Sequence, residues 1–588
     1  ITIKDDNADE SFQLYDHPHV YIFKNEKYLP KEELKAILIQ GENQIRAKYS
    51  TKSKIKGFPN PNIGLLRDKP MALLPVISVF MWYLLVQLLS FIVMPLHFKV
   101  FNNFADKGYG LAKISGIFIF AWLNWIIVSC GLFKFYQKNL FILFFVLLIL
   151  SFIAYRNKLK EVNSFVKENK RHILFTEIVF LASYLFFIII KLWAPDIHNV
   201  SGHGYNGGGE PMGMAYLSAI YNDVKFPPHD PWLSGWTLNY YYWGQLMLAT
   251  LSKLLGYEPR ITYNLSLALL FALCFTGAFT LVYNMTKKYG YALFGSFLLA
   301  LSGNFHTLEF ILDKLWNANN LSQFINSTGV FQFIWDPTRI YPTPVITEMP
   351  FFSYLYGDLH AHNIVIPIMV FGFALIYNVI LHRNKTTNFL NSFGGSRINV
   401  FLSCFMIALI LGAMLPMNTW NFPPMLILVA VAFFIVGINL FRDNFKITRK
   451  IKTETVIKNV LYSIGIAVVS AIVLTLISYV LYIPFHSGFQ SPYKTSPHLI
   501  SKAERASLYV MFKYFSVFFF IIFAYIYFVL GGGIDRFSKK LSLHKMFKIK
   551  KPDFNKIMGV VVKVMNKIND NFSLSIRFYV TVIILILF

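Results

Sequence analysis

A short segment of the sequence, Asp358-Leu359-His360-Ala361-His362, carries three side chains that can bind a metal ion or a phosphate. On an extended backbone, residues two positions apart point to the same side, so the carboxylate and both imidazoles would converge. This set suits a divalent cation such as Mg or Mn, and it also suits a phosphate. The alternative is that the histidines have a structural role at the membrane interface.

Other charged side chains could bind the same phosphate. Arg339 has a guanidinium group that can form two parallel hydrogen bonds to a phosphate. Lys494 lies in a mildly basic, aromatic segment that could line the mouth of the same cavity. Glu348 precedes Asp358 in the same polar loop, and we expect it to contact the substrate.

A second polar stretch, 195–261, contains three candidate carboxylates next to a predicted membrane surface among its acidic residues, namely Asp196, Glu210 and Asp230. A carboxylate in that place can remove the proton from an incoming hydroxyl group, or bind a cation that holds a phosphate. The alternative interpretation is that these acids cap helices and turns. The loop is therefore a candidate substrate site, with Asp230 as a candidate substrate contact.

The same stretch contains three consecutive tyrosines, Tyr240, Tyr241 and Tyr242, near the start of an apolar segment at 238–255. Polar residues interrupt this segment, which argues against a membrane span. We therefore predict an amphipathic helix in the membrane interface, with the tyrosines at the level of the lipid headgroups. We also expect the three tyrosines to contact the substrate.

These polar segments are set in a strongly apolar chain. Of 588 residues, 55% are hydrophobic and only 14% are charged, against about 25% charged residues in a typical soluble domain. Apolar runs of about 20 residues, the length of a helix that crosses a bilayer, recur along the chain. The sequence therefore predicts an all-α polytopic membrane protein and excludes a water-soluble globular protein.

We predict about 12 membrane spans from these apolar runs. The predicted spans are 71–97, 112–133, 139–155, 173–194, 262–285, 290–303, 364–381, 398–416, 423–441, 459–483, 508–531 and 574–588. Long polar loops at 195–261 and 304–363 interrupt them. The polar candidate residues therefore gather in loops between the predicted spans.

The distribution of charge predicts the orientation in the membrane. The chain has 55 Lys and Arg against 30 Asp and Glu. If 238–255 does not span, most basic loops fall on one side, which the positive-inside rule makes cytoplasmic, and both long polar loops fall outside. This pattern predicts a multi-pass protein of the cell membrane with an external active site, and it explains the basic charge without nucleic acid.

Two domains are predicted. Residues 1–70 are polar and are predicted to form an external soluble segment, the tail of a preceding domain, because the segment is too short for its own core. Residues 71–588 are predicted to form the transmembrane domain. Since the apolar run at 580–588 has no polar flank, we expect a chain truncated at its C-terminus.

Several motifs resemble those of the YYY membrane proteins, a family named for its tyrosine triplet and similar to the GT-C superfamily of polytopic glycosyltransferases. The matching motifs are Glu210-Pro211-Met212, the FPPHDPW segment at 226–232, the NYYY segment at 239–242, the segment from Glu348 to His362, and 106–113. The resemblance covers roughly 70–500 of the chain.

This resemblance implies a GT-C-like bundle of transmembrane helices with long external loops and interfacial helices. It implies an enzyme that transfers a sugar from a polyprenyl-phosphate donor to a glycan, lipid or protein acceptor on the external face. Glu210 stands where such enzymes carry the acid near the acceptor, and Asp196 is the second choice. Gly213 stands where the family often has Asp. A tandem glycosyltransferase unit before residue 1 is a further expectation.

Two other functions stay open at this point. A transporter or flippase of lipid-linked glycans would require polar or broken helices at mid-bilayer depth. A non-catalytic membrane subunit would present the external loops to partners and would tolerate neutralisation of Glu210.

Overall fold

A computed structural model of the chain describes residues 73–156, 158–193, 209–233, 235–317, 335–341, 346–381, 393, 396–440, 453–490 and 505–530. Across these residues the regular structure is helical, and the β pairing consists of an isolated bridge between His229 and Thr237. The prediction of an all-α polytopic membrane protein is confirmed. Residues 1–70 and the predicted span 574–588 lie outside the described residues.

Within the described residues, 8 helical stretches are long and apolar enough to cross a membrane. They are Val76–Val100, Tyr109–Ser129, Gln137–Arg156, Leu159–Leu192, Pro259–Thr286, Ala361–Leu381, Arg397–Leu440 and Ile457–Leu481. Each coincides with a predicted span, except that Arg397–Leu440 contains two of them. Helices α16 (Arg397–Asn418) and α17 (Phe422–Leu440) are separated there by the short helix η5 (Thr419–Asn421).

Two predicted spans differ from the structure. The segment predicted at 290–303 forms α9 (Tyr289–Ala300), whose 12 residues are too few to cross a bilayer alone. The segment predicted at 508–531 is divided at Phe515 into α20 (Leu508–Tyr514) and α21 (Ser516–Leu530). In both cases the apolar composition was read correctly, but the length of the uninterrupted helix was not.

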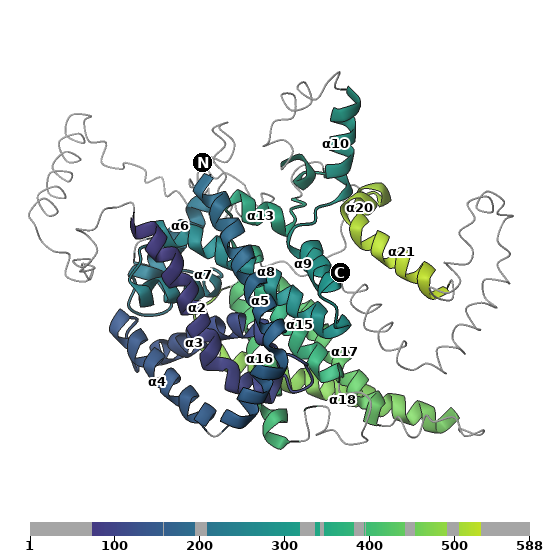
Figure 1. Ribbon diagram of the computed structural model, residues 1–588, viewed down its shortest axis with the longest axis horizontal. Helices are drawn as coiled ribbons and strands as arrows, with labels where there is room; N and C mark the ends of the chain where they lie inside the picture. Colours follow the sequence, from purple (N-terminus) through teal and green to yellow (C-terminus); the bar gives the residue numbers. More distant parts are fainter. Residues whose placement is uncertain are drawn as a thin grey trace, which may run out of the picture.

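Helix α8 (Pro259–Thr286) is the centre of the bundle (Figure 1). It packs against α5 (Leu159–Trp193), α9 and α15 (Ile366–Leu381). Every residue from Leu265 to Cys274 is buried, as expected for a helix that is apolar on all sides and must be covered all round.

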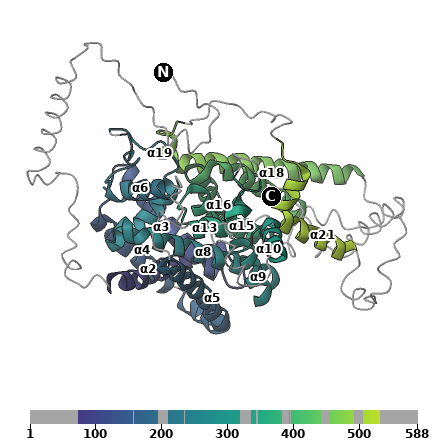
Figure 2. The same cartoon turned by 90° about the horizontal axis from the view of Figure 1, so that it is seen from above.

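The other long helices cover this centre. Helices α2 (Leu73–Val100), α3 (Ala112–Ser129) and α4 (Gln137–Arg156) pack together, and α18 (Thr453–Leu481) packs on α16 and α17. Figure 2 shows α18 along one edge of the bundle. Outward side chains of this helix, such as Val469, are exposed apolar groups suited to lipid.

Helix α7 (Trp243–Leu255) does not lie on an exposed interface as expected. As predicted, it is not a membrane span, since its 13 residues are too few to cross a bilayer. However, every residue from Trp243 to Leu254 is buried among α3, α4, α6 (Gly209–Asn222), α8 and α16. Some of its polar groups find partners inside the protein: Ser252 Oγ lies 2.9 Å from both Leu248 O and Thr262 Oγ1. The polar residues that suggested a water-facing side therefore bind neighbouring helices.

An ion pair, together with a glutamine that binds both of its members, joins three of the candidate spans. Lys113 Nζ of α3 lies 2.6 Å from Glu177 Oε1 of α5, and the lysine side chain is fully buried. Gln87 of α2 binds both partners, with its Oε1 3.1 Å from Lys113 Nζ and its Nε2 2.8 Å from Glu177 Oε2. The apolar composition of these helices did not predict this pair.

Close packing of α2 and α3 depends on the absence of a side chain at Gly116. A β-carbon there would lie 2.5 Å from the Leu89 carbonyl oxygen. We therefore expect Gly116→Ala to lower the free energy of unfolding by about 1–3 kcal/mol through overpacking. The measurement is thermal unfolding of the protein in nanodiscs, followed by tryptophan fluorescence.

The matched control is Gly465→Ala in α18, where a β-carbon meets nothing within 4 Å. Because alanine favours the helix, this variant is expected to unfold at the wild-type temperature or slightly above it. Equal unfolding temperatures for the two variants would contradict the role given to Gly116.

Candidate functional site

The Asp358–His362 segment crosses the end of the bundle between α13 (Pro350–Tyr356) and α14 (Ala361–Ile364). Gly357 ends α13 in the left-handed region, at φ 92°, which only glycine adopts readily. Tyr263 of α8 donates from its hydroxyl to Gly357 O at 2.8 Å, and Gln245 of α7 donates to Leu359 O at 3.0 Å. Two buried helices therefore hold the backbone of this segment.

The structure brings Asp358, His360 and His362 together. The extended backbone assumed for their spacing is present only up to His360, because His362 lies in the helical turn α14. The Nδ1 atoms of the two histidines are 3.0 Å apart, and His362 Nε2 lies 3.6 Å from Asp358 Oδ2. One candidate ligand atom from each residue lies within 4.8 Å of the others. The Oδ1 atom of Asp358 is buried and has no hydrogen-bond partner, so the carboxylate has unused binding capacity.

Glu348 extends this group on the other side of His362. Its Oε2 lies 3.8 Å from His362 Nε2, and Ser353 Oγ lies 3.4 Å from the same carboxylate oxygen and 3.3 Å from His362 Nε2. Burial raises the pKa of Glu348 above its usual range, and the charge of Asp358 adds to this rise, whereas His362 and Arg339 oppose it. Burial also raises the pKa of Asp358, again against the effect of His362.

Arg339 is held beside Glu348. Its Nη1 lies 3.2 Å from Glu348 Oε1 and donates to the carbonyl and hydroxyl oxygens of Thr338 at 3.0 and 2.8 Å. The guanidinium also lies over the ring of Trp335, at 4.1 Å from the centroid. With 26% of its side chain exposed, Arg339 is a positioned cation at the edge of the cluster.

The tyrosine triplet is divided between the site and the core. The Tyr240 hydroxyl lies 3.1 Å from His360 Nε2, whereas the Tyr242 hydroxyl accepts from Trp125 Nε1 at 3.2 Å inside the bundle. Tyr241 is buried against Phe489, with ring centroids 6.1 Å apart. Of the three predicted contacts, Tyr240 is therefore the one that the structure brings to the histidines.

The predicted acids are placed differently. Glu210 lies in the first turn of α6, with its side chain outside the described part, and Asp196 lies outside it entirely. One turn after Glu210, a β-carbon at Gly213 would be 3.2 Å from Leu359 O, so α6 passes close to the Asp358 segment. Asp230 Oδ1 accepts from the backbone N–H groups of Trp232 and Leu233, which is the turn-capping alternative.

Lys494 also lies outside the described residues. The segment before it is described, and the side chain of Asn239 forms two hydrogen bonds of 2.8 Å with the backbone of Gln490. The chain just before Lys494 therefore contacts Asn239, the residue that precedes Tyr240.

Several residues around the site were not predicted from the sequence. Tyr263 lies 94 positions from the glycine that it binds, and no local pattern links them. Lys191 is buried at the end of α5, and a β-carbon at Gly357 would lie 3.0 Å from its Nζ. Ser353 was part of the family motif, but only the structure shows it between Glu348 and His362.

Comparison with known proteins identifies the family. Residues 119–587 match the model of a family described as uncharacterized membrane protein (DUF2298). No curated protein and no solved structure matches the chain significantly. The matched region contains the whole Arg339–His362 cluster and the tyrosine triplet. The chain thus belongs to the DUF2298 family of uncharacterized membrane proteins.

Proposed function

We propose that this protein is a membrane glycosyltransferase that moves a sugar from a polyprenyl-phosphate donor to an acceptor hydroxyl on the external face. The observation that carries the proposal is the cluster of Arg339, Glu348, Asp358, His360 and His362 at one end of a membrane helix bundle. Cationic, imidazole and carboxylate groups together are what transfer from a phosphate leaving group requires.

The proposed reaction needs a base and a stabilised leaving group. The acceptor oxygen attacks the anomeric carbon, the bond from that carbon to the donor phosphate breaks, and its electron pair stays with the phosphate. The base takes the hydroxyl proton. We assign this role to Glu210, with Asp196 as the second choice, on the resemblance to GT-C enzymes and on the position of Glu210 in α6.

The leaving phosphate is proposed to bind near Arg339, His360 and His362, with Lys494 as a further contact. A hydrogen bond to Thr338 and the stacking on Trp335 hold the Arg339 guanidinium in one position. A cation that is already positioned stabilises developing charge without reorganisation, and partial burial strengthens the interaction.

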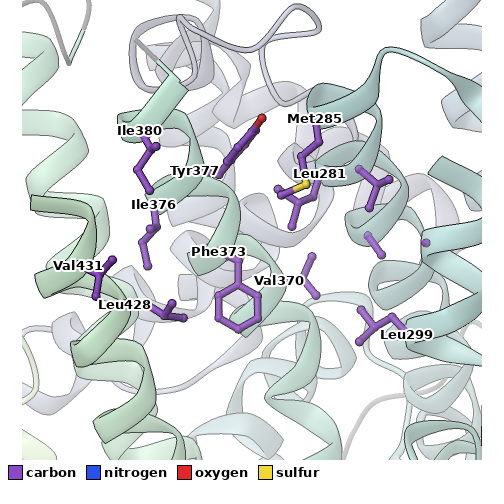
Figure 3. Close-up of a pocket in the computed structure, with 13 residues that line it drawn as sticks. Leu281, Met285, Leu299, Val370, Phe373, Ile376, Tyr377, Ile380, Leu428 and Val431 are labelled. Carbon is purple, nitrogen blue, oxygen red and sulfur yellow. The ribbon is translucent and has the colours of Figure 1, made fainter. Parts of the chain in front are cut away.

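An apolar cavity in the same bundle supports a lipid-linked donor. A cavity of about 240 Å³ lies between α8, α9, α15 and α17, and Figure 3 shows hydrocarbon side chains such as Leu281, Phe373 and Val431 around it. Val370, on its wall, follows His362 along nearly continuous helix by ~12 Å. We propose that the prenyl chain of the donor occupies this cavity while its phosphate lies at the cluster.

One observation favours a second candidate, a flippase for lipid-linked glycans. The Lys113–Glu177 pair lies within two candidate spans, and ionisable groups at that depth often mark transport pathways. The same pair also serves helix packing, and the apolar cavity does not distinguish the two functions. An assay of sugar transfer distinguishes a glycosyltransferase from a flippase.

The first test is transfer by purified protein in nanodiscs, supplied with polyprenyl-phosphate sugars and candidate acceptors and read by mass spectrometry. Wild type is expected to form a donor-dependent product, and Glu210→Gln to form it at least ~100-fold more slowly, because the base is lost. The control Glu161→Gln, which removes an exposed carboxylate paired with Lys158, is expected to keep the wild-type rate.

Equal rates for wild type and Glu210→Gln would move the base to Asp196. Absence of product from the wild type, combined with movement of the lipid-linked sugar across vesicles, would overturn glycosyl transfer in favour of the flippase.

The second test concerns the apolar cavity. Val431→Trp places an indole in the cavity and is expected to raise KM for a long-chain donor about tenfold, since loss of two buried CH₂ contacts costs ~1.6 kcal/mol. KM for a donor with a short prenyl chain should not change. Steady-state kinetics with both donors measures this difference.

The matched control is Val469→Trp on the exposed side of α18, where Val469 is 61% exposed. It should leave both KM values unchanged. An equal rise for short and long donors in Val431→Trp would contradict a tail-binding role for the cavity.

A further inference from the structure

We infer that Asp358, His360 and His362 bind one divalent transition-metal ion of the zinc class, and that Tyr240 positions His360 for it. This inference concerns the site on which the proposed function rests. Its test measures metal binding directly, so it can hold where glycosyl transfer fails, and the reverse.

The geometry of the three side chains supports a shared ion. Ligand atoms bound to one ion at 2.0–2.2 Å lie about 3–3.5 Å from each other. The Nδ1 atoms of His360 and His362 are already 3.0 Å apart, whereas Asp358 Oδ2 lies 3.6 Å from Nε2 of His362, the other nitrogen of that ring. One ligand atom from each of the three residues lies within 4.8 Å of the others. To share one ion, the Asp358 and His362 side chains have to turn so that the carboxylate approaches the His362 nitrogen that faces His360, while Tyr263 and Gln245 hold the backbone of the segment.

A second observation points to a ligand independently. Asp358 is 9% exposed, and its Oδ1 is buried without a hydrogen-bond partner. Buried carboxylate oxygens are ordinarily paired, and an unpaired one calls for an ion or a proton. A metal ion bound by the histidines would lie on this carboxylate and use its free capacity.

The surrounding charge also favours a cation. Glu348 and Asp358 both lie within 4 Å of His362 Nε2, at 3.8 and 3.6 Å. Two carboxylates at that distance repel a phosphate that enters alone, whereas a divalent cation neutralises them and inverts the local charge. Glu348 would then lie beside the ion as a further carboxylate.

The ligand types select the metal. Mg²⁺ and Ca²⁺ prefer sites built from oxygen atoms, whereas two imidazoles with one carboxylate suit Zn²⁺, Co²⁺ and similar ions. The set therefore favours Zn²⁺ over the Mg²⁺ or Mn²⁺ suggested by the sequence. Zn²⁺ is the expected ion, and Co²⁺ can replace it for measurements by absorption spectroscopy.

Tyr240 controls which nitrogen of His360 is available. Its hydroxyl lies 3.1 Å from His360 Nε2. If Nε2–H donates to this oxygen, the Nδ1 lone pair faces His362 and the ion. The Tyr240 ring is itself packed against Tyr216 and Tyr241, with centroids 5.7 and 4.7 Å away. Such outer partners orient a ligand without touching the metal.

The test uses the full chain in nanodiscs, stripped with a chelator and titrated with Zn²⁺ against a chromophoric competitor. Wild type should bind one Zn²⁺ per chain, and Mg²⁺ in excess should not displace it. Asp358→Asn, His360→Gln and His362→Gln should each weaken binding at least ~100-fold. Tyr240→Phe should keep one ion per chain but weaken binding about 10–100-fold.

Matched controls remove the same groups elsewhere. His306→Gln removes a histidine paired with Glu309, and Tyr479→Phe removes the hydroxyl of an exposed tyrosine in α18. Both should bind Zn²⁺ like wild type. Co²⁺ absorption adds a second measurement: its ligand-field bands should shift in Tyr240→Phe and stay unchanged in Tyr479→Phe.

Three results would overturn the inference. They are wild type without a bound ion, Zn²⁺ displaced by Mg²⁺, and ligand variants that bind as tightly as the His306→Gln control. Folding is checked for each variant by thermal unfolding, so that loss of metal is distinguished from loss of structure. Normal Zn²⁺ binding with no transfer product would leave the metal site standing and reject the proposed function.

Discussion

The candidate site depends on two hydrogen bonds to one short stretch of backbone. Tyr263 of α8 and Gln245 of α7, both buried, bind the carbonyl groups on either side of Asp358. Local hydrogen bonds, such as the one from Asn363 Nδ2 to Asp358 O at 2.9 Å, shape the segment itself, and the two bonds from α7 and α8 fix it against the bundle. Because the backbone is held, the carboxylate and both imidazoles are presented from one rigid platform, and α6 can approach it closely at Gly213.

The sequence predicted the ligands better than it predicted their support. The five-residue spacing of Asp358, His360 and His362 predicted that the three groups gather, although His362 lies in the helical turn α14 rather than on the extended backbone that was assumed. The sequence did not predict the hydrogen bond from Tyr263 to Gly357, since these two residues lie far apart in the chain. Nor could the sequence tell Tyr240 from Tyr242, although one lies beside His360 and the other binds Trp125 in the core.

The fold shows the same division between local and non-local information. The eight helical stretches long enough to cross a membrane followed directly from apolar runs, whereas the predicted spans 290–303 and 508–531 form shorter helices. Helix α7 was misplaced because polar residues such as Ser252 and Gln245 look water-facing in one dimension. In the folded chain their partners are supplied by α8 and by the Asp358 segment, which no amphipathic pattern reveals.

The buried Lys113–Glu177 pair has a consequence for how this protein enters its membrane. Neither side chain can face lipid alone without a large penalty, and Gln87 adds a third polar group on another helix. Helices α2, α3 and α5 therefore have to meet before they are released into the bilayer. Helices α2 and α3 are synthesised before α5, so Lys113 has no ionic partner until Glu177 of α5 has been synthesised. The helices from α2 to α5 therefore form a single unit of membrane insertion rather than a series of independent spans.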